Sequence, residues 1–338
     1  MKKTMLKKML SLSCAGMMTL SLAACGSTND APAGSTGEDG GVEIGILQYA
    51  PHPSLDNCYQ GVIEGLAEAG YVDGENGVKI VFQNANGSGA DADMMAKTMA
   101  SSADMLIAVA TPAAMSCYSA ARNEQIPVIY AAASDPIGSG LAKDLADPQT
   151  GASGTKDALN LEGQMQMIRA MLPEADTIGI LYTTSEPNSL AHLQTFQQLA
   201  PDYGFTIEAV GITNESEVAA GAAALVAKGV DCVNNFTDNN VVNNLSTLLH
   251  ATDAANIPVF GSEEEQVRNG CVAAESLDYV ALGRETGAMA ASVLSGAADI
   301  MSLPVSIVEV SSPVYSASNC EKFGVSMPES YNALNLDV

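Results

Sequence analysis

The sequence predicts an α/β fold with two similar lobes, each built on a parallel sheet between helices. Short apolar runs alternate with longer helical patterns along the chain after residue 42. Strands that are apolar throughout are buried on both faces, as in parallel sheets that helices cover. The sequence also repeats itself: IGIL at 44–47 returns at 178–181, and IPV at 126–128 returns at 257–259. Because the two offsets are 134 and 131 residues, two lobes of one build are expected.

The elements of the first lobe follow from its runs of residues. Short apolar runs predict strands, and the longer segments between them, with apolar residues at helical spacing, predict helices. A third repeated tag, DMLI at 104–107 and DCV at 231–233, falls in the same order as the other two. Each lobe is therefore expected to be Rossmann-like. The expected order is strand 42–49, helix 56–70, strand 78–83, helix 89–102, strand 104–110, helix 112–124 and strand 126–132.

The N-terminus has the pattern of a lipoprotein signal. Residues 1–8 carry four lysines, residues 9–23 are apolar, and Ala23 and Ala24 precede Cys25. A basic start, an apolar run and small residues before a cysteine are typical of a secretory signal that ends in a lipobox. Cleavage before Cys25 would let its thiol carry lipid, which predicts an extracytoplasmic protein anchored to the outer face of the bacterial cell membrane. An ordinary cleaved signal with an incidental cysteine is the simpler alternative.

Residues 26–41 (GSTNDAPAGSTGEDGG) are small, polar and acidic, and predict a flexible linker. Without the leader the chain keeps ten Lys and Arg against 39 Asp and Glu, a net charge of −29. Nucleic acids and anionic lipid surfaces are therefore implausible partners. Acidity that only keeps an exported protein soluble is the simplest interpretation.

The cysteines after Cys25 predict neither a disulfide scaffold nor a zinc site. Their number is odd, their spacing is wide and irregular, and none form a C-x-x-C pair. Several lie in apolar runs, so we expect buried free thiols. These cysteines are Cys58, Cys117, Cys232, Cys271 and Cys320.

Catalytic chemistry has no signature in the chain. His52, His192 and His250 are not at metal-ligand spacing, and there is no G-x-S-x-G elbow, H-E-x-x-H motif or Walker loop. We therefore expect no metal, no cofactor and no enzymatic activity. An exported enzyme on a doubly wound fold would need a positioned nucleophile or base, which the sequence does not reveal.

The loops after the strands are where a ligand is expected, because parallel sheets bind ligands beyond the carboxyl ends of their strands. After strand 104–110, Thr111 supplies a capping hydroxyl and Pro112 suits the first helical position. The N–H groups of such a helix start suit a carboxylate. In the matching loop of the second lobe, Asp238 can hold an ammonium group. Two simpler interpretations stay open: Thr111 only caps its helix, and Asp238 only favours the helix dipole.

An anion site that faces a cation site fits a zwitterion such as an amino acid. Four further loops at strand ends, rich in proline and short polar or acidic residues, belong to the same expected crevice. These loops are 49–56 (YAPHPSLD), 132–136 (AASDP), 183–189 (TTSEPNS) and 262–265 (SEEE).

Three motifs are the most specific in the chain: SEPNS at 185–189, TDN at 237–239 and IPVFGSEEEQV at 257–267. With them, SDP at 134–136 and the DY pair at 278–279 complete a pattern that resembles a known family from residue 42 onward. That family comprises the lipoprotein solute-binding components of ABC importers, in the branch associated with aromatic amino acids. The resemblance implies a periplasmic-binding-protein-like fold of type I, in which hinge closure clamps a ligand between the lobes.

The resemblance also implies partners and roles. The partners would be a small-molecule ligand, namely an amino acid and most simply an aromatic one, and the ABC permease and ATPase subunits; a small aliphatic or other zwitterionic ligand stays open. The carboxylate would bind Thr111 and the N–H groups of Ala113 and Ala114, and the ammonium group would bind Asp238. The other expected ligand-binding residues are Tyr49, Leu55, Asp56, Ser134, Asp135, Ser185, Glu186, Asn188, Ser189, Thr237, Asn239 and Ser262.

The expected lobes are discontinuous in sequence. The first would contain 42–157 and 279–308, and the second 158–278 and 309–338, after the leader 1–25 and the linker 26–41. The chain would then cross a multi-strand hinge three times. Because one fold can serve several functions, a ligand-sensing lobe that presents a solute to a membrane receptor is the alternative function.

Overall fold

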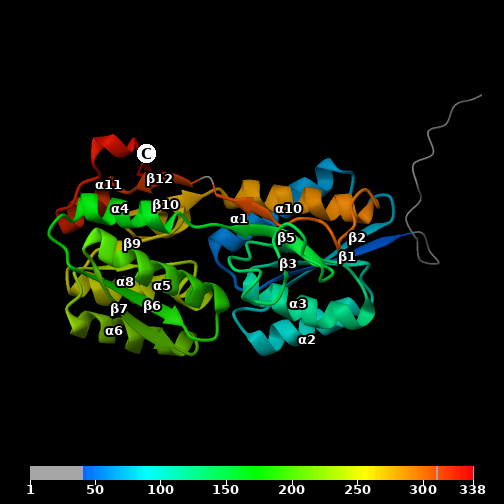
Figure 1. Cartoon of the computed structure of the whole chain (residues 1–338), viewed down its shortest axis with the longest axis horizontal. Coiled ribbons are helices and arrows are strands. Elements are labelled where there is room, and N and C mark those ends of the chain that lie inside the picture. The colour runs from blue at the N-terminus through cyan, green and yellow to red at the C-terminus, as the bar shows by residue number, and fades with distance from the viewer. Residues whose placement is uncertain (1–40, 310, 338) are drawn as a thin grey trace, which may run out of the picture. The chain divides into compact units, whose positions relative to one another are not determined.

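The computed structural model describes residues 41–309 and 311–337, whose strands form three sheets (Figure 1). The predicted leader 1–25 and residues 26–40 of the predicted linker lie outside the described residues. The first lobe contains a six-stranded parallel sheet in the order β11, β5, β4, β3, β1, β2. Its strands are β1 (Val42–Gln48), β2 (Val78–Asn84), β3 (Met105–Val109), β4 (Val128–Ala131), β5 (Ala152–Asp157) and β11 (Ser306–Val308).

Two pairs of helices cover the faces of this sheet. On one face lie α1 (Pro53–Glu68) and α10 (Tyr279–Leu294), which pack against each other, and on the other lie α2 (Gly89–Ala100) and α3 (Thr111–Glu124) (Figure 1). Strand β3 is buried at every residue because helices lie on both sides of it. The apolar run at 104–110 is therefore a strand covered by helices on both faces, as the sequence predicts.

Capping residues explain where these helices begin. Ser88 accepts a hydrogen bond from Asp91 N–H at the start of α2, and Asp278 accepts one from Ala281 N–H at the start of α10. Helix α1 begins three residues before the predicted start at 56, because Pro53 occupies its first turn, where a missing N–H costs nothing. The four predicted strands agree with β1 to β4 to within two residues at each end.

The second lobe repeats this arrangement on a smaller sheet. Its four parallel strands have the order β7, β6, β8, β9, with α4 and α5 on one face and the packed pair α6 and α8 on the other. The strands are β6 (Thr177–Thr183), β7 (Thr206–Ile212), β8 (Cys232–Asn234) and β9 (Val259–Phe260). The helices are α4 (Leu161–Met171), α5 (Pro187–Leu199), α6 (Val218–Lys228), α7 (Asn239–Asn243), α8 (Leu245–Ala254) and α9 (Glu264–Arg268), with 3₁₀ turns at Ala200–Tyr203 and Glu215–Glu217.

The repeated tags mark equivalent strands. In the first sheet β1 pairs with β2 and β3, and β3 pairs with β4; in the second, β6 pairs with β7 and β8, and β8 pairs with β9. The repeat IGIL lies in β1 and again in β6, at the same place in each sheet. The predicted α/β fold with two lobes of one build is thereby confirmed.

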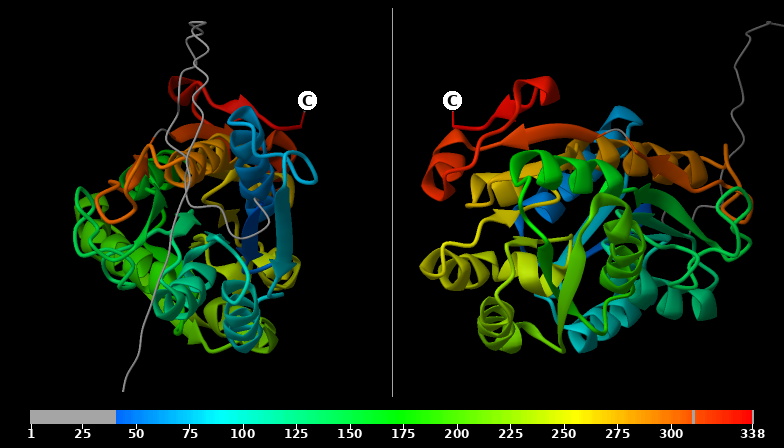
Figure 2. Two further views of the ribbon diagram at one scale, coloured as in Figure 1. Left: turned by 90° about the vertical axis from the view of Figure 1, so that its right-hand side faces the viewer. Right: turned by 60° about the vertical axis from the view of Figure 1, so that its left-hand side comes forward.

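Three connections join the two lobes. The chain passes from β5 to α4, from β10 to α10 and from β11 to β12, and β10 pairs antiparallel with β12 in a third sheet that β13 completes. The strands of this sheet are β10 (Ala273–Leu277), β12 (Ser311–Tyr315) and β13 (Leu334–Asn335). The C-terminal elements that follow β12 lie on the second lobe (Figure 2), and besides β13 they are α11 (Ala317–Phe323) and a 3₁₀ turn at Glu329–Tyr331.

Within residues 41–309 and 311–337, every helix is too short or too polar to cross a membrane.

All five cysteines after the leader are buried and unpaired, as the sequence predicts. Burial raises the pKa of the Cys58, Cys117, Cys232 and Cys271 thiols far above the normal range, which suppresses the reactive thiolate.

We therefore predict that iodoacetamide leaves Cys58, Cys117, Cys232, Cys271 and Cys320 unmodified in the native protein and labels all five after denaturation. Peptide mass mapping measures this, and labelling of any of the first four in the native state would contradict their burial.

Candidate functional site

A narrow cavity lies between the lobes, at the carboxyl ends of the strands of both parallel sheets. Its volume is 20 Å³, which is room for about one water molecule. A ligand of amino-acid size therefore requires the lobes or their side chains to move apart. The lining residues are His52, Leu55, Ala110, Thr111, Ala132, Ser134, Asp157, Asn188, Thr237, Asn239, Glu263 and Tyr279.

A wider cleft of 760 Å³ opens beside this cavity. Tyr49 lines it from the first lobe, where its hydroxyl donates to Gly87 O at 2.9 Å, and Ser185 and Glu186 line it from the second. Glu186 also hydrogen-bonds Asn188 and Asn239, which line the narrow cavity. The Glu186 carboxylate therefore lies between the cleft and the cavity.

The two oxygens of Glu186 have different surroundings. Oε2 accepts hydrogen bonds from Asn188 Nδ2 at 3.1 Å, Asn239 N at 3.1 Å and Asn239 Nδ2 at 2.6 Å, whereas the buried Oε1 has no partner within the described residues. Burial, and then the charge of Asp238, raise the pKa of Glu186 to about 8. A cation beside Oε1 would satisfy that atom and lower this pKa.

Asp238, the predicted ammonium partner, is fully buried and occupied by donors of its own lobe. Its Oδ1 accepts from the Thr183 hydroxyl at 2.8 Å and from Val241 N at 3.1 Å, and its Oδ2 accepts from Thr183 N at 2.5 Å and from the Ser189 hydroxyl at 2.7 Å. The bond from Val241 caps α7. Neither Asp238 nor Ser189 lines the cavity or the cleft. The geometry therefore favours the helix-capping interpretation of Asp238.

Two further buried carboxyl groups, Asp157 and Glu263, line the narrow cavity. Asp157 accepts from the Ser134 hydroxyl at 2.8 Å and from the Tyr279 hydroxyl at 3.0 Å, and Glu263 accepts from Gln266 Nε2 at 2.9 Å. Burial raises the pKa of Asp157, and it raises the pKa of Glu263 to about 7. The part of a ligand that contacts these carboxyl groups is therefore expected to be a hydrogen-bond donor or a cationic group.

Several buried polar atoms around the cavity lack a hydrogen-bond partner within the described residues. An unpaired buried polar atom costs about 1–3 kcal/mol, so such atoms gathered at one cavity indicate a polar ligand. They come from both lobes, as expected for a ligand held between them. These atoms are His52 Nδ1, Thr111 Oγ1, Asn188 Oδ1 and Thr237 Oγ1, with Glu186 Oε1 beside them.

The backbone of the cavity wall is strained at two alanines. Ala110 has φ 80° and ψ 153°, and Ala132 has φ 54°, conformations that residues with a Cβ rarely adopt. Ala110 directly follows β3 and Ala132 directly follows β4, and both line the cavity. Strain of this kind persists where surrounding structure enforces it, commonly at ligand sites.

The start of α3 differs from the prediction. Ala110, not Thr111, occupies the cap position, and the helix has no side-chain cap, so the Thr111 hydroxyl is buried and free for a ligand. Ala113 and Ala114 are buried but line neither the cavity nor the cleft. The N–H of Ala114 donates to Ala110 O at 3.0 Å, so in this conformation that N–H is used within the helix.

Three other predicted residues serve the local structure. Asp56 is exposed and accepts from Gln48 Nε2 at 2.7 Å, and Asp135 accepts from Gly138 N at 2.9 Å within its turn. Ser262 donates to Asn235 O at 2.9 Å. None of the three lines the cavity or the cleft. The predicted residues that do gather there are Leu55, Thr111, Ser134, Asn188, Thr237 and Asn239 in the cavity, and Tyr49, Ser185 and Glu186 in the cleft.

Six cavity residues were absent from the sequence-based set. His52 and Ala132 lie in loops that the sequence singled out, so the position after a strand was a usable signal for them. Glu263 lies in the singled-out loop 262–265, and Tyr279 lies in the DY pair, but neither was assigned to the site. Asp157 lies where the chain crosses between the lobes, and no local motif marks it. The six residues are His52, Ala110, Ala132, Asp157, Glu263 and Tyr279.

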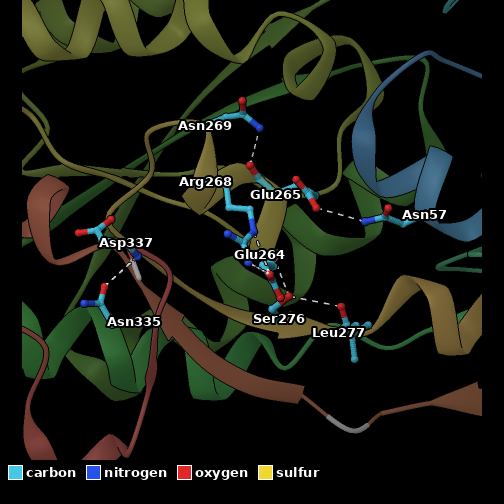
Figure 3. Close-up of polar contacts among 9 residues, drawn as sticks. All are labelled: Asn57, Glu264, Glu265, Arg268, Asn269, Ser276, Leu277, Asn335 and Asp337. Atoms are coloured by element: carbon cyan, nitrogen blue, oxygen red, sulfur yellow. Dashed lines mark hydrogen bonds and ion pairs between the residues drawn. The ribbon is translucent and has the colours of Figure 1, made fainter.

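Direct contacts join the two lobes. His52 Nε2 lies 3.4 Å from Asn239 Oδ1, and both residues are buried. On the side of the third sheet, Asn57 of α1 donates to Glu265 of α9 at 3.2 Å (Figure 3). A groove of 710 Å³ runs beside this second contact. The structure therefore represents a conformation in which the lobes touch.

Comparison with known proteins gives consistent relatives. A tyrosine-binding protein of Clostridioides difficile (strain R20291) is 34% identical over 296 residues, which cover 86% of this chain and 85% of the relative. The crystal structure of an ABC domain in complex with L-Trp from Streptococcus pneumonia is 33% identical and superposes with a TM-score of 0.83, covering 86% of this chain and 97% of that one.

A ligand-free, open structure of a substrate binding protein with adhesive properties from Clostridium difficile is 32% identical, with a TM-score of 0.65 and coverage of 87% and 99%. At nearly equal identity, this chain superposes less well on that open structure than on the L-Trp complex. The model of the ABC transporter substrate binding protein family matches residues 43–337, and the chain belongs to that family.

Proposed function

We propose that the protein is the extracytoplasmic solute-binding lipoprotein of an ABC importer, which captures an aromatic L-amino acid between its lobes and delivers it to the membrane permease. A substrate-binding protein of this family binds a solute without transforming it, so the protein is not an enzyme. The proposal of a small polar ligand rests on the buried polar atoms without hydrogen-bond partners that line one cavity between the two lobes.

The charge pattern of the site supports a zwitterion. Glu186 Oε1 offers a buried, unpaired carboxylate oxygen for an ammonium group, and the Thr111 hydroxyl lies at the first turn of α3, where a carboxylate is favoured. We therefore propose Glu186 as the ammonium partner and Asp238 as the residue that holds Thr183 and the start of α7 in place.

The aromatic preference rests on relatives and on the pocket wall. One relative is named a tyrosine-binding protein, and one related structure holds L-Trp. Leu55 supplies an apolar wall beside the polar groups, and Tyr49 lines the entrance. An amphipathic aromatic side chain fits a wall of that mixed kind.

Ligand entry requires hinge opening, because the cavity is far smaller than an amino acid in this conformation. We propose lobes formed by 42–157 with 279–308 and by 158–278 with 309–338, which move about the three connections. Closure around the ligand excludes water, which strengthens each charged contact. We further propose that Cys25 carries the lipid anchor and that 26–41 tethers the lobes to the membrane.

A thermal-shift screen tests the ligand class, since a ligand that binds only the folded state raises the melting temperature by mass action. We expect an increase of several degrees with millimolar L-tyrosine or L-tryptophan, and no change with D-glucose, myo-inositol or adenosine. The same concentrations of L-alanine and L-leucine serve as controls for zwitterions without an aromatic ring. A response to a sugar or a nucleoside alone would contradict the proposal.

A further inference from the structure

His52 is the cavity residue whose chemistry the proposed site does not yet use. It precedes α1, its side chain is 5% exposed, and it lines the narrow cavity together with Leu55 of the same segment. Its Nε2 faces Asn239 of the other lobe, while its buried Nδ1 has no hydrogen-bond partner within the described residues. A buried ring nitrogen without a partner requires an explanation.

The hydrogen bonds of Asn239 fix which nitrogen of His52 carries the proton. Asn239 Nδ2 donates to Glu186 Oε2 at 2.6 Å, which orients the amide so that its Oδ1 faces His52 Nε2 at 3.4 Å. An amide oxygen only accepts, so Nε2 must be the donor of that contact. Burial lowers the pKa of His52 to about 4, so the ring is neutral at pH 7 and holds a single proton. Nδ1 is therefore an acceptor without a donor.

A ligand that fills the cavity can satisfy this acceptor only by presenting an O–H or N–H group. Tyrosine has a phenolic O–H and tryptophan an indole N–H, whereas phenylalanine has neither on its side chain. Leu55, on the same wall, suits the ring that carries such a group. A buried acceptor left unpaired by phenylalanine would carry its full desolvation cost.

We propose that His52 Nδ1 accepts a hydrogen bond from the side-chain O–H or N–H of the ligand, and thereby selects tyrosine and tryptophan over phenylalanine. This inference rests on the proposed function, because it assumes an aromatic amino acid in the cavity. It assigns His52 a role in specificity. Asn188 Oδ1 is another unpaired cavity atom that can only accept, so the His52 variants are needed to assign the preference to His52. Glu186 Oε1 faces the charged end of the ligand, and the hydroxyls of Thr111 and Thr237 can donate as well as accept.

Isothermal titration calorimetry on the full-length protein tests this with L-tyrosine, L-tryptophan, L-phenylalanine and p-fluoro-L-phenylalanine. The fluoro compound fills the space of the hydroxyl without donating. For the native protein we expect tyrosine and tryptophan to bind at least about 10-fold more tightly than phenylalanine and its fluoro analogue. In His52→Leu we expect the preference to fall below about 3-fold, mainly through weaker tyrosine binding. His52→Asn keeps an acceptor near the position of Nδ1 and should retain part of the preference.

The outcomes separate two failures. If the native protein binds none of the four compounds, the proposed function fails and this inference fails with it. If the affinities of the native protein for all four compounds agree within about 3-fold, or if His52→Leu weakens all four equally, the site binds aromatic amino acids but His52 does not recognise the side-chain O–H or N–H group. His250→Ala is the control for a histidine replacement, because His250 is exposed and does not line the cavity. Should His52→Leu fail to fold, the ratio of tyrosine affinity to p-fluorophenylalanine affinity is compared between the native protein and His52→Asn. A ratio below about 3 in the native protein, or an equal ratio in both proteins, would contradict the proposal.

Discussion

Replacing Glu186 with glutamine is expected to weaken the binding of the proposed amino-acid ligand by about 100-fold and to raise the melting temperature of the ligand-free protein. The first effect follows because the buried, unpaired Oε1 is the proposed partner of the ligand ammonium group, and loss of one member of a buried charge pair costs about 2–5 kcal/mol. The second follows because burial disfavours the charged form of Glu186, so near neutral pH the fold must take up a proton at this group, whereas glutamine needs none. Calorimetric titration measures the affinity, and scanning calorimetry measures the melting temperature.

The pH dependence of the same group gives a sharper test. Its pKa is raised from 4.5 to about 8, so the folded protein without ligand binds a proton that the unfolded chain has released. This group therefore makes the fold progressively less stable as pH rises from about 4.5 to about 8, and the loss is complete above that value. Ligand binding should show the opposite trend. The ammonium group binds more tightly as pH rises towards about 8, because a smaller fraction of Glu186 is protonated and has to release its proton on binding.

Proton release separates this linkage from a general effect of pH. At pH 7, titrations in buffers of different ionisation enthalpy should show release of a substantial fraction of a proton for each ligand bound by the native protein, and much less in Glu186→Gln. Glu215→Gln is a matched control, because Glu215 lines the same wide cleft but is exposed. Its affinity should stay within about 2-fold of the native value. Equal proton release in the native protein and in Glu186→Gln would assign the titrating group elsewhere.

The difference between Glu186 and Asp238 shows what the sequence could not provide. Both carboxylates follow apolar strands of the second lobe, and sequence position alone gave them equal access to the crevice. Their roles differ because Asp238 is saturated by four donors, two of them on Thr183, which lies far from it in the sequence. Hydrogen-bond saturation depends on tertiary packing, and no local pattern encodes it.

Fold prediction succeeded where local patterns are strong. Strands β1 and β6 carry the same tag and occupy equivalent places in their sheets, because a fully apolar run between helices has few other solutions. Thr111 shows the limit of such patterns: its residue type predicted a cap, but the strained Ala110 takes the cap position and leaves the hydroxyl free. Asp157 and Tyr279 meet only because two crossings between the lobes bring them together.

The packing of α1 against α10 leads to the largest expected effect on stability. The two helices approach closely through glycines on both sides, Gly61 and Gly65 on α1 and Gly283 and Gly287 on α10. A Cβ on Gly283 would lie 2.0 Å from Cys58 O, and a Cβ on Gly61 would lie 2.1 Å from Val280 O. Because the obstructing atoms are backbone, no side-chain rotation can relieve the overlap, and the helices must separate.

We therefore expect Gly283→Ala to lower the free energy of unfolding by about 3 kcal/mol or more, which denaturant titration measures. Gly89→Ala is the control, because Gly89 begins α2 with nothing within 4 Å of its added Cβ, and we expect that change to be neutral or slightly stabilising.

A double variant tests the physical cause. Once Gly283→Ala has forced the helices apart, the gap accommodates a second methyl group, so Gly61→Ala should cost much less in that background than in the native protein. Simple additivity would show that each methyl group is absorbed locally, and would contradict a shared helix separation. Helix α10 directly follows β10 and the crossing at Asp278, so such a separation also displaces the hinge. Gly283→Ala should therefore weaken ligand binding although no atom of Gly283 lines the cavity.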